Sequence, residues 1–217
     1  MSVPVLIPVN RLERAKGRLA GLLSPDERTT LSLITLETVL HAAGPRSIVL
    51  TADRRVAEAV RGKGRVLVES PDLDGLNPQL EAAMATLLAE GVARESLLIL
   101  HADLPLATTE AIESLLAMGR PNAITAVESR DGGTNAMLLQ PPGKFPLAYG
   151  PASFARHAAA ARQAGMHVSV NPNRELRLDL DTPGDITELL RAPRGRQGAA
   201  GRYLQSIGVE ARLAARA

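Results

Sequence analysis

A loop near the start of the chain gathers cations where a short apolar segment ends. Residues 3–8 are predicted to form a strand, and Arg11, Arg14, Lys16 and Arg18 follow it closely. Several cations together with free backbone N–H groups are what a polyphosphate needs from a protein. The GxxxxGK[ST] pattern of a Walker A loop is absent. We therefore weigh a phosphate-binding loop against a basic loop that is only solvated.

Three aspartates occupy positions that suit a divalent cation. Asp103 comes two residues after the apolar segment 96–101, and a carboxylate there is costly unless it caps a turn, is paired or binds a metal ion. Asp179 lies in a segment predicted to be extended from residue 176 to 180, and Asp181 directly follows it, so on a strand both would point to the same face. A cation would relieve their mutual repulsion, and magnesium prefers a few carboxylates plus phosphate oxygens. Asp181 could instead cap the helix that follows it.

Further polar segments could complete a pocket for a phosphorylated substrate. Residues 131–135 form a tight turn before a strand, and residues 149–154 lead into a helix whose N-terminus can hold an anion. Arg156 and His157 lie near the start of that helix, where cations would favour an anionic ligand. Asn77 could cap another helix or contact a base or ribose edge. Taken singly, each segment is equally well explained as an ordinary turn or cap.

These segments need a scaffold that brings them together. Apolar segments alternate with helical patterns, which predicts an α/β fold with a mostly parallel sheet and helices on both faces. Ligands of such folds bind at the carboxyl ends of the strands. A capping box at Ser24 and Glu27 begins one helix. Strands are expected over 3–8, 47–51, 65–69, 96–101, 123–127, 134–140, 167–170 and 176–180, and helices over 25–43, 54–62, 78–91, 108–118, 153–165 and from 182.

Composition narrows the class of protein. Of 217 residues, 45% are hydrophobic and 22% are charged, as in a globular domain. Aromatic residues make up only 2%, which argues against base stacking on aromatic rings. The absence of cysteine excludes disulfides and zinc–thiolate sites, and no apolar run reaches the length of a membrane span. We expect a cytoplasmic protein that binds neither membranes nor nucleic acid.

Charge divides the chain into two parts. Residues 191–217 contain six Arg and one Glu, although the net charge of the whole chain is only +2. We predict one domain over residues 1–191 and a basic tail over 192–217, with a Pro- and Gly-rich linker at 192–201 before a short helix. The tail could contact nucleic acid or an anionic partner, but a solvated tail is the simpler explanation.

The ordered set of motifs resembles the guanylyltransferase family of coenzyme F-420 biosynthesis, which acts on 2-phospholactate or phosphoenolpyruvate. Each motif is weak alone, whereas the set in this order is specific. The resemblance leaves residues 192–217 uncovered. Asn10 stands where the family pattern leads us to expect Lys, so Arg11 or Arg14 substitutes for it or triphosphate affinity is lower. The matching segments are residues 7–19, 23–28, 49–53, 75–77, 102–106, 131–135, 149–157 and 178–183.

The resemblance implies a single Rossmann-like nucleotidyltransferase domain that transfers GMP from GTP to a phosphorylated three-carbon acid and releases pyrophosphate. The acceptor would be phosphoenolpyruvate, 2-phospho-L-lactate or 3-phospho-D-glycerate, and the next enzyme of the pathway would be a functional partner. The resemblance also implies catalytic roles for Lys16 and Asp103, magnesium ligation by Asp103, Asp179 and Asp181, GTP binding by Pro8, Arg11, Arg14, Lys16, Arg18, Thr51, Asp53 and Asn77, and acceptor-phosphate binding by Thr134, Gly150 and Ser153.

Two other functions can be built on the same residues. A nucleotidyltransferase of the same fold could act on a sugar phosphate or a cofactor precursor. A non-catalytic nucleotide- or partner-binding module would use the basic tail but has no need of the ordered carboxylates, which argues against it. Either a monomer or an oligomer is compatible with the sequence.

Overall fold

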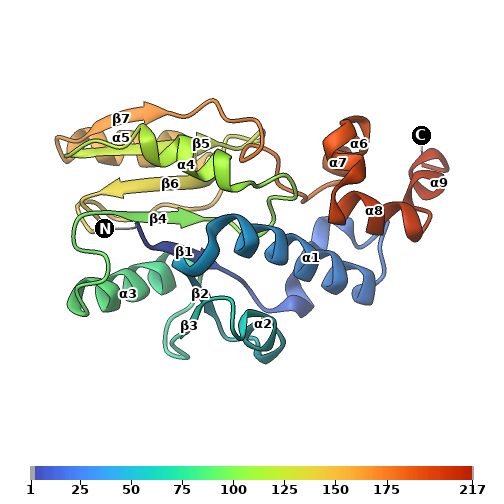
Figure 1. The fold of residues 1–217 in the computed structure, drawn as a ribbon, viewed down its shortest axis with the longest axis horizontal. Coiled ribbons are helices and arrows are strands. Elements are labelled where there is room, and N and C mark those ends of the chain that lie inside the picture. The colour runs from blue at the N-terminus through green and yellow to red at the C-terminus, as the bar shows by residue number, and fades with distance from the viewer. Residues whose placement is uncertain (1–2, 217) are drawn as a thin grey trace.

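A seven-stranded sheet forms the centre of the chain, whose residues 3–216 are described by a computed structural model. Its strand order is β3-β2-β1-β4-β6-β5-β7 (Figure 1). Strand β6 is antiparallel to β4 and β5, and the other strand pairs are parallel, as the sequence predicted. The strands are β1 (Val5–Pro8), β2 (Ser47–Thr51), β3 (Arg65–Val68), β4 (Leu97–Leu100), β5 (Ala123–Glu128), β6 (Thr134–Gln140) and β7 (His167–Val170).

Helices cover both faces of the sheet, because the strands bury apolar side chains on both sides. Along β1, Ile7 belongs to one buried core and its neighbour Leu6 to the other. Helices α1, α2 and α4 pack on the first core, and α3 and α5 on the second. The helices are α1 (Pro25–Ala43), α2 (Arg54–Val60), α3 (Leu76–Ala89), α4 (Thr109–Ala117), α5 (Ser153–Gln163), α6 (Pro183–Arg191), α7 (Pro193–Gln197), α8 (Ala199–Ser206) and α9 (Val209–Ala214).

Helix α1 begins with the predicted capping box. The Ser24 hydroxyl accepts a hydrogen bond from the Glu27 N–H at 3.2 Å, and the Ser24 N–H donates to the Glu27 carboxylate at 2.8 Å. Pro25 occupies the first helical position, where its missing N–H costs nothing. The cap therefore fixes where the cationic loop after β1 ends and the helix starts.

The C-terminal residues form helices where a linker was predicted at 192–201. Helices α6, α8 and α9 share a third apolar core with Leu19, Leu23 and Leu31. Figure 1 shows α8 of this segment beside α1. A Cβ at Gly195 or Gly201 would collide with the backbone of a neighbouring turn. These glycines therefore serve close packing, and the linker prediction is wrong because it interpreted them as flexible. The domain boundary at 191/192 stays a prediction.

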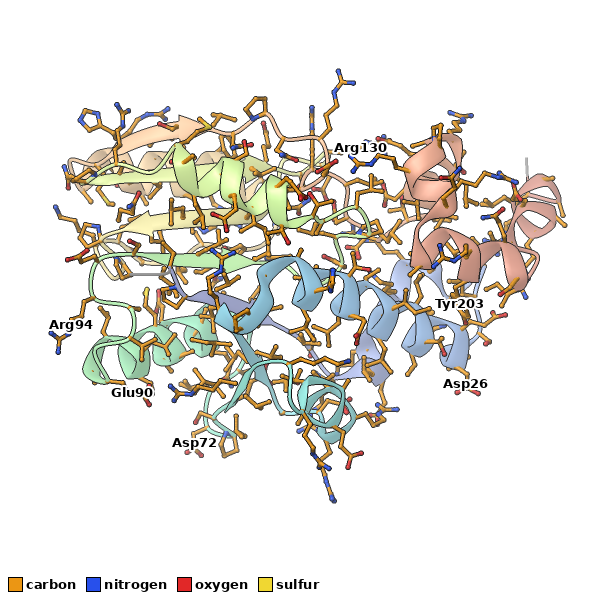
Figure 2. All side chains as sticks on the ribbon, viewed as in Figure 1. Asp26, Asp72, Glu90, Arg94, Arg130 and Tyr203 are labelled. Carbon is orange, nitrogen blue, oxygen red and sulfur yellow. The ribbon has the colours of Figure 1, made fainter. Side chains whose placement is uncertain are left out.

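The basic side chains of this segment are largely paired. Arg196 pairs with Glu210 at 2.8 Å, and Arg212 pairs with Glu27 of α1 at 2.8 Å. Figure 2 shows Tyr203 of α8 beside α1, and its hydroxyl lies 3.4 Å from the Glu27 carbonyl oxygen. The tail is thus docked on the body and not solvated along its length. None of the helices within residues 3–216 combines the length and the apolarity that a bilayer crossing requires.

Candidate active site

The carboxyl ends of β1, β3 and β4 surround a cavity of about 580 Å³. The loop after β1 and the first residues after β4 line one end of it, and the loop after β3 lines the other. Parallel neighbours present their carboxyl ends at the same edge of a sheet, which is why residues far apart in the sequence meet here. The sequence predicted this location.

Asp103, Asp179 and Asp181 come together at the β4 end of this cavity. Each offers one carboxylate oxygen, and these oxygens all lie within 4.8 Å of one another. Asp103 and Asp181 line the cavity, whereas Asp179 lies next to them without lining it. The structure therefore brings together the three aspartates that the sequence singled out as magnesium ligands.

Asp179 and Asp181 do not converge for the reason that the sequence suggested. Residues 176–180 were predicted to be a strand, but they form a turn followed by backbone that pairs with no strand. The Asn135 amide donates hydrogen bonds to the carbonyl oxygens of Leu176 and Arg177, and the Leu180 N–H donates to the Asp103 carbonyl oxygen. A side chain and a loop thus satisfy this backbone in place of a neighbouring strand.

Asn135 is a site residue that was predicted only as part of the turn at residues 131–135, with no role of its own. It lies on β6 with 3% of its surface exposed, and its amide also donates to Asp179 Oδ1 at 3.3 Å. An amide within an otherwise apolar strand must find partners, and this was the available signal. Asn135 holds the segment that carries two of the three aspartates.

The alternative role of Asp181 as a helix cap is wrong. Thr182 is the N-cap of α6, and its hydroxyl accepts a hydrogen bond from the Asp185 N–H at 3.3 Å. Asp185 returns the bond to the Thr182 N–H at 2.7 Å, which completes a capping box. The Asp181 carboxylate is therefore left to face the cavity.

Lys16 is the cation closest to the three aspartates among the described residues. Its Nζ lies 3.7 Å from Asp103 and 4.0 Å from Asp181, and it donates to the Leu180 carbonyl oxygen at 2.7 Å. Only 4% of the side chain is exposed. Lys16 also has a φ of 52°, a left-handed conformation that is uncommon outside glycine and is typical of functional positions.

The electrostatics of the cluster fit a divalent cation. Burial, followed by the neighbouring charges of Asp103 and Asp181, raises the pKa of Asp179 to about 6, against the lowering effect of the Asn135 hydrogen bond. Burial and Asp103 also raise the pKa of Asp181, although Lys16 opposes this effect. Asp103 Oδ1 is buried and has no hydrogen-bond partner among the described residues. A small hard cation would satisfy all of these groups at once.

The cationic loop contributes most of its predicted residues to the cavity. Arg11, Arg14 and Lys16 line it, together with Pro8 and Asn10. Arg18 does not line it: its side chain is 67% exposed and lies 3.9 Å from Asp131. The loop therefore offers three of its four cations to a ligand.

Thr51 and Asp53 lie behind this loop and not among the cavity-lining residues. Asp53 caps α2 through the Arg55 N–H and also accepts the Leu12 N–H at 2.9 Å. The Arg55 side chain and these N–H groups lower the pKa of Asp53 to about 2. Thr51 Oγ1 accepts the Asp53 N–H at 3.1 Å. Both residues thus help to shape the loop after β1.

Asn77 neither caps α3 nor faces the cavity. The N-cap is Gly75, and Asn77 lies in the first turn. Its amide donates to the Tyr149 carbonyl oxygen at 3.1 Å and accepts the Tyr149 N–H at 2.7 Å. The capping interpretation is wrong because this two-point contact ties α3 to the loop before α5.

Thr134, Ser153 and His157 form a buried hydrogen-bonded group at the same edge of the sheet. His157 Nε2 accepts the Ala148 N–H at 2.9 Å, so its proton is on Nδ1, which lies 3.1 Å from the Thr134 hydroxyl. Burial, followed by Arg156, lowers the pKa of His157 to about 4. His157 is therefore neutral, and the prediction that it adds positive charge for an anion is wrong. Gly150, with a φ of 126°, lies in the loop beside this group.

Comparison with known proteins connects this geometry to a family. The family described as "Guanylyl transferase CofC like" matches residues 3–216. A phosphoenolpyruvate guanylyltransferase of Sphaerobacter thermophilus is 39% identical over 87% of this chain and 93% of its own length. A 2-phospho-L-lactate guanylyltransferase of Methanoregula boonei is 33% identical over 89% of this chain and 83% of its own length.

The fold is also found in solved structures. A crystal structure from Desulfovibrio desulfuricans G20, named as a candidate nucleotide-diphospho-sugar transferase, superposes with a TM-score of 0.78. The alignment covers 98% of this chain and 97% of that one at 17% identity. The likeness confirms the nucleotidyltransferase type of α/β fold.

Proposed function

The chain belongs to the family of CofC-like guanylyl transferases, and we propose that it transfers GMP from GTP to phosphoenolpyruvate, with release of pyrophosphate, in coenzyme F-420 biosynthesis. One observation supports this assignment more than any other. Three carboxylates whose oxygens lie within 4.8 Å of one another meet at one end of a cavity that two further cations line, and the buried Lys16 Nζ lies 3.7 Å from Asp103. Such a site suits phosphoryl chemistry between two anions.

The aspartates Asp103, Asp179 and Asp181 would hold magnesium. When bound, the ion supplies positive charge for the phosphate oxygens of both substrates. The residues fit this role because two of them carry raised pKa values and the third has an unpartnered buried oxygen.

The cations of the loop after β1 would hold the triphosphate of GTP. Lys16 is fixed by the Leu180 carbonyl oxygen, so its charge is already in place before a substrate arrives. Arg11 and Arg14 line the same cavity and can bind the outer phosphates. Arg14 and Arg11 would also take the place of the cation that Asn10 does not supply.

The reaction requires no protein nucleophile. An oxygen of the acceptor phosphate forms a bond to the α-phosphorus of GTP, and the bond from that phosphorus to the β-phosphate bridge breaks. Pyrophosphate leaves with the electron pair, and no proton needs to be removed from the attacking oxygen. The protein must orient two anions and stabilise the charge of the leaving group, which Lys16 and the arginines can do.

Thr134, Gly150 and Ser153 are the proposed contacts to the acceptor phosphate. The Ser153 hydroxyl donates to Thr134 Oγ1 at 3.1 Å, and the protonated His157 Nδ1 donates to the same oxygen. The Thr134 hydroxyl therefore accepts twice and keeps its own hydrogen to donate to a ligand. Thr134 precedes Asn135, which contacts Asp179, so this donor lies next to the aspartates.

Phosphoenolpyruvate is the preferred acceptor because the relative with 39% identity carries that name, whereas the 2-phospho-L-lactate relative is 33% identical. 2-Phospho-L-lactate and 3-phospho-D-glycerate are the alternatives. The acceptors differ by little more than a hydroxyl, a methyl group or the phosphate position, so small differences in contacts select among them. We also propose that the enzyme acts in the cytoplasm beside the next enzyme of the pathway.

Pyrophosphate release with GTP, magnesium and each acceptor in turn tests the proposal. Release with phosphoenolpyruvate and a lower kcat/KM with the other two acids is the expected result. The assay is repeated with the next pathway enzyme present, which removes an accumulating product. No release with any of the three acids under both conditions would overturn the proposed function.

A further inference from the structure

The end of the cavity away from the aspartates is lined in part by apolar side chains. It is lined by the loop after β3 and the start of α3, where Leu73 of the loop and Leu76 of the helix each expose 37% of their surface. Strands β3, β2, β1 and β4 are consecutive neighbours in the sheet. Three steps of about 4.8 Å therefore separate the β3 end from the β4 end, roughly 14 Å in all. If Lys16 and the aspartates bind the phosphates, the base of the nucleotide reaches the β3 end.

Glu69 is the carboxylate at this end of the cavity. It directly follows β3, and its N–H donates to the Thr51 carbonyl oxygen at 3.3 Å, which continues the pairing of β3 with β2. Its side chain is half-buried, lines the cavity and makes no ion pair among the described residues. Burial raises its pKa, and the charge of Arg11 and the Ala52 N–H offset this effect only in part. The carboxylate is thus partly desolvated, and within residues 3–216 its side chain is not engaged by an arginine or lysine in an ion pair.

The other acidic residues near this end are not equivalent to Glu69. Asp53 already accepts hydrogen bonds from Leu12 and Arg55 and does not line the cavity. Asp74 lines the cavity but is exposed to solvent. Asp72 lies at the outer edge of the molecule and points outward (Figure 2). Glu69 is therefore the carboxylate best placed to meet a buried base.

The loop that surrounds Glu69 is held in place by Gln79 of α3. The buried Gln79 amide accepts the Ser70 N–H at 2.9 Å and donates to the carbonyl oxygens of Ser70 and Leu73 at 2.6 and 2.7 Å. Three hydrogen bonds from one side chain fix the loop without any ligand. A base would thus meet a preorganised wall, which lowers the entropic cost of binding.

We propose that the Glu69 carboxylate accepts the N1–H and N2–H hydrogen bonds of guanine and is the residue that selects GTP over other nucleoside triphosphates. This inference rests on the proposed function, because it takes GTP as the substrate and the β4 end as the phosphate site. Guanine presents two parallel donors on this edge, and a carboxylate presents two acceptors. Adenine presents an acceptor at N1 and would place it against the negative charge of Glu69. The apolar side chains of Leu73 and Leu76 can contact the purine ring.

Nucleotides that differ by one hydrogen-bonding group test the proposal in wild-type, E69A and E69Q chains. Inosine triphosphate lacks only the 2-amino group of guanine. ATP has a hydrogen-bond acceptor at N1 and a donor on C6, where GTP has a donor and an acceptor. We measure kcat/KM from pyrophosphate release and, independently, nucleotide affinity by calorimetry. D74N is the matched control, because Asp74 lines the same cavity but is exposed.

The wild-type chain is expected to prefer GTP over inosine triphosphate by about tenfold or more, since a hydrogen bond to a charged group is lost. In E69A this preference falls to about onefold, and the affinity for GTP falls by about 100-fold. In E69Q the preference moves from GTP towards ATP, because an amide offers one donor and one acceptor. D74N keeps the wild-type preferences.

Unchanged GTP:inosine triphosphate and GTP:ATP ratios in both folded variants would overturn the proposal. If E69A does not fold, as judged by circular dichroism, the isosteric E69Q variant decides. Failure of the proposed function gives a different result, since the wild-type chain then releases no pyrophosphate with GTP. Calorimetric GTP and inosine triphosphate affinities still decide the role of Glu69 in that case.

Discussion

Carboxylates in the cavity and at the junction of α1 with α9 have opposite environments. In the cavity, burial raises the pKa of Asp179 to about 6 and the unpartnered Oδ1 of Asp103 is buried. At the junction, the Arg212 side chain and then the Ser24 N–H lower the pKa of Glu27 to about 2. Glu27 accepts from Arg212 at 2.8 Å with both oxygens and from the Ser24 N–H at 2.8 Å.

The difference separates binding chemistry from structural stabilisation. A buried carboxylate oxygen without a hydrogen-bond donor lowers the stability of the folded chain. Such a destabilising group is tolerated at a binding site, because the ligand supplies the missing positive charge. Where protein donors are present, as at Glu27, the carboxylate stabilises the fold, and its oxygens are already occupied by hydrogen bonds within the protein. Replacing a cavity carboxylate should therefore remove activity, and replacing the junction carboxylate should remove stability.

D103N is expected to have the largest effect on activity. We expect kcat to fall by about 1000-fold, because a neutral amide is a poor magnesium ligand. The midpoint of thermal unfolding in the absence of metal should stay the same or rise, since like charges no longer repel one another. Steady-state kinetics and thermal unfolding measure both effects, and near-wild-type turnover would contradict the role of Asp103.

K16M is expected to reduce kcat/KM by about 100-fold, because the triphosphate loses a fixed cation. It should also destabilise the fold by about 1–2 kcal/mol, since the Leu180 carbonyl oxygen loses its donor and two aspartates lose a neighbouring charge. K16R is the control for charge. It should not restore activity, because a side chain that is 4% exposed leaves no room for a guanidinium group.

E27Q, at the junction of α1 with α9, is expected to reduce stability and to leave activity unchanged. We expect the free energy of unfolding to fall by about 1 kcal/mol, a value kept small because the Arg212 side chain is 39% exposed. Turnover should stay near that of the wild-type chain at temperatures where the variant is folded. A double-mutant cycle with R212M isolates the pair, and a coupling energy of zero would show that Glu27 and Arg212 act separately.

The pH dependence of this stabilisation follows from the lowered pKa of Glu27. The folded value of about 2 lies below the ordinary value of 4.5, so the contribution is complete above pH 4.5. It is lost as the pH falls towards 2, where Glu27 takes up a proton. The stability difference between wild type and E27Q should therefore disappear in acid, as chemical denaturation at several pH values would show. A difference that persists at pH 2 would contradict this assignment.

The strands and helices could be predicted from patterns of residues that are adjacent in the sequence. The apolar run of β2 and the capping box of α1 each depend on residues adjacent in the sequence, and both elements match their predicted bounds. The location of the site could also be predicted, because the parallel strands bring their carboxyl ends together. Asp103, which comes shortly after β4, was recognised in this way. Asp179 and Asp181 were recognised from their spacing on a predicted strand, but residues 176–180 do not form a strand in the structure.

The predictions that were wrong concern residues whose partners are distant in the sequence. Gly195 and Gly201 have the composition of a linker, and only the packing of α6, α7 and α8 shows that they serve close contact. Residues 176–180 have the pattern of a strand, yet Asn135 satisfies their backbone. Asn77 has the type of a cap, but its partner, Tyr149, lies 72 residues away. No local pattern specifies such pairings.

Thermal unfolding with and without magnesium, at saturating GTP, compares the two regions most directly. Magnesium is expected to raise the unfolding midpoint of the wild-type chain and of E27Q, because both keep the three cavity aspartates. The same addition should leave D103N unchanged. A magnesium-dependent rise in D103N equal to that of the wild-type chain would contradict the conclusion that the cavity carboxylates are reserved for a cation.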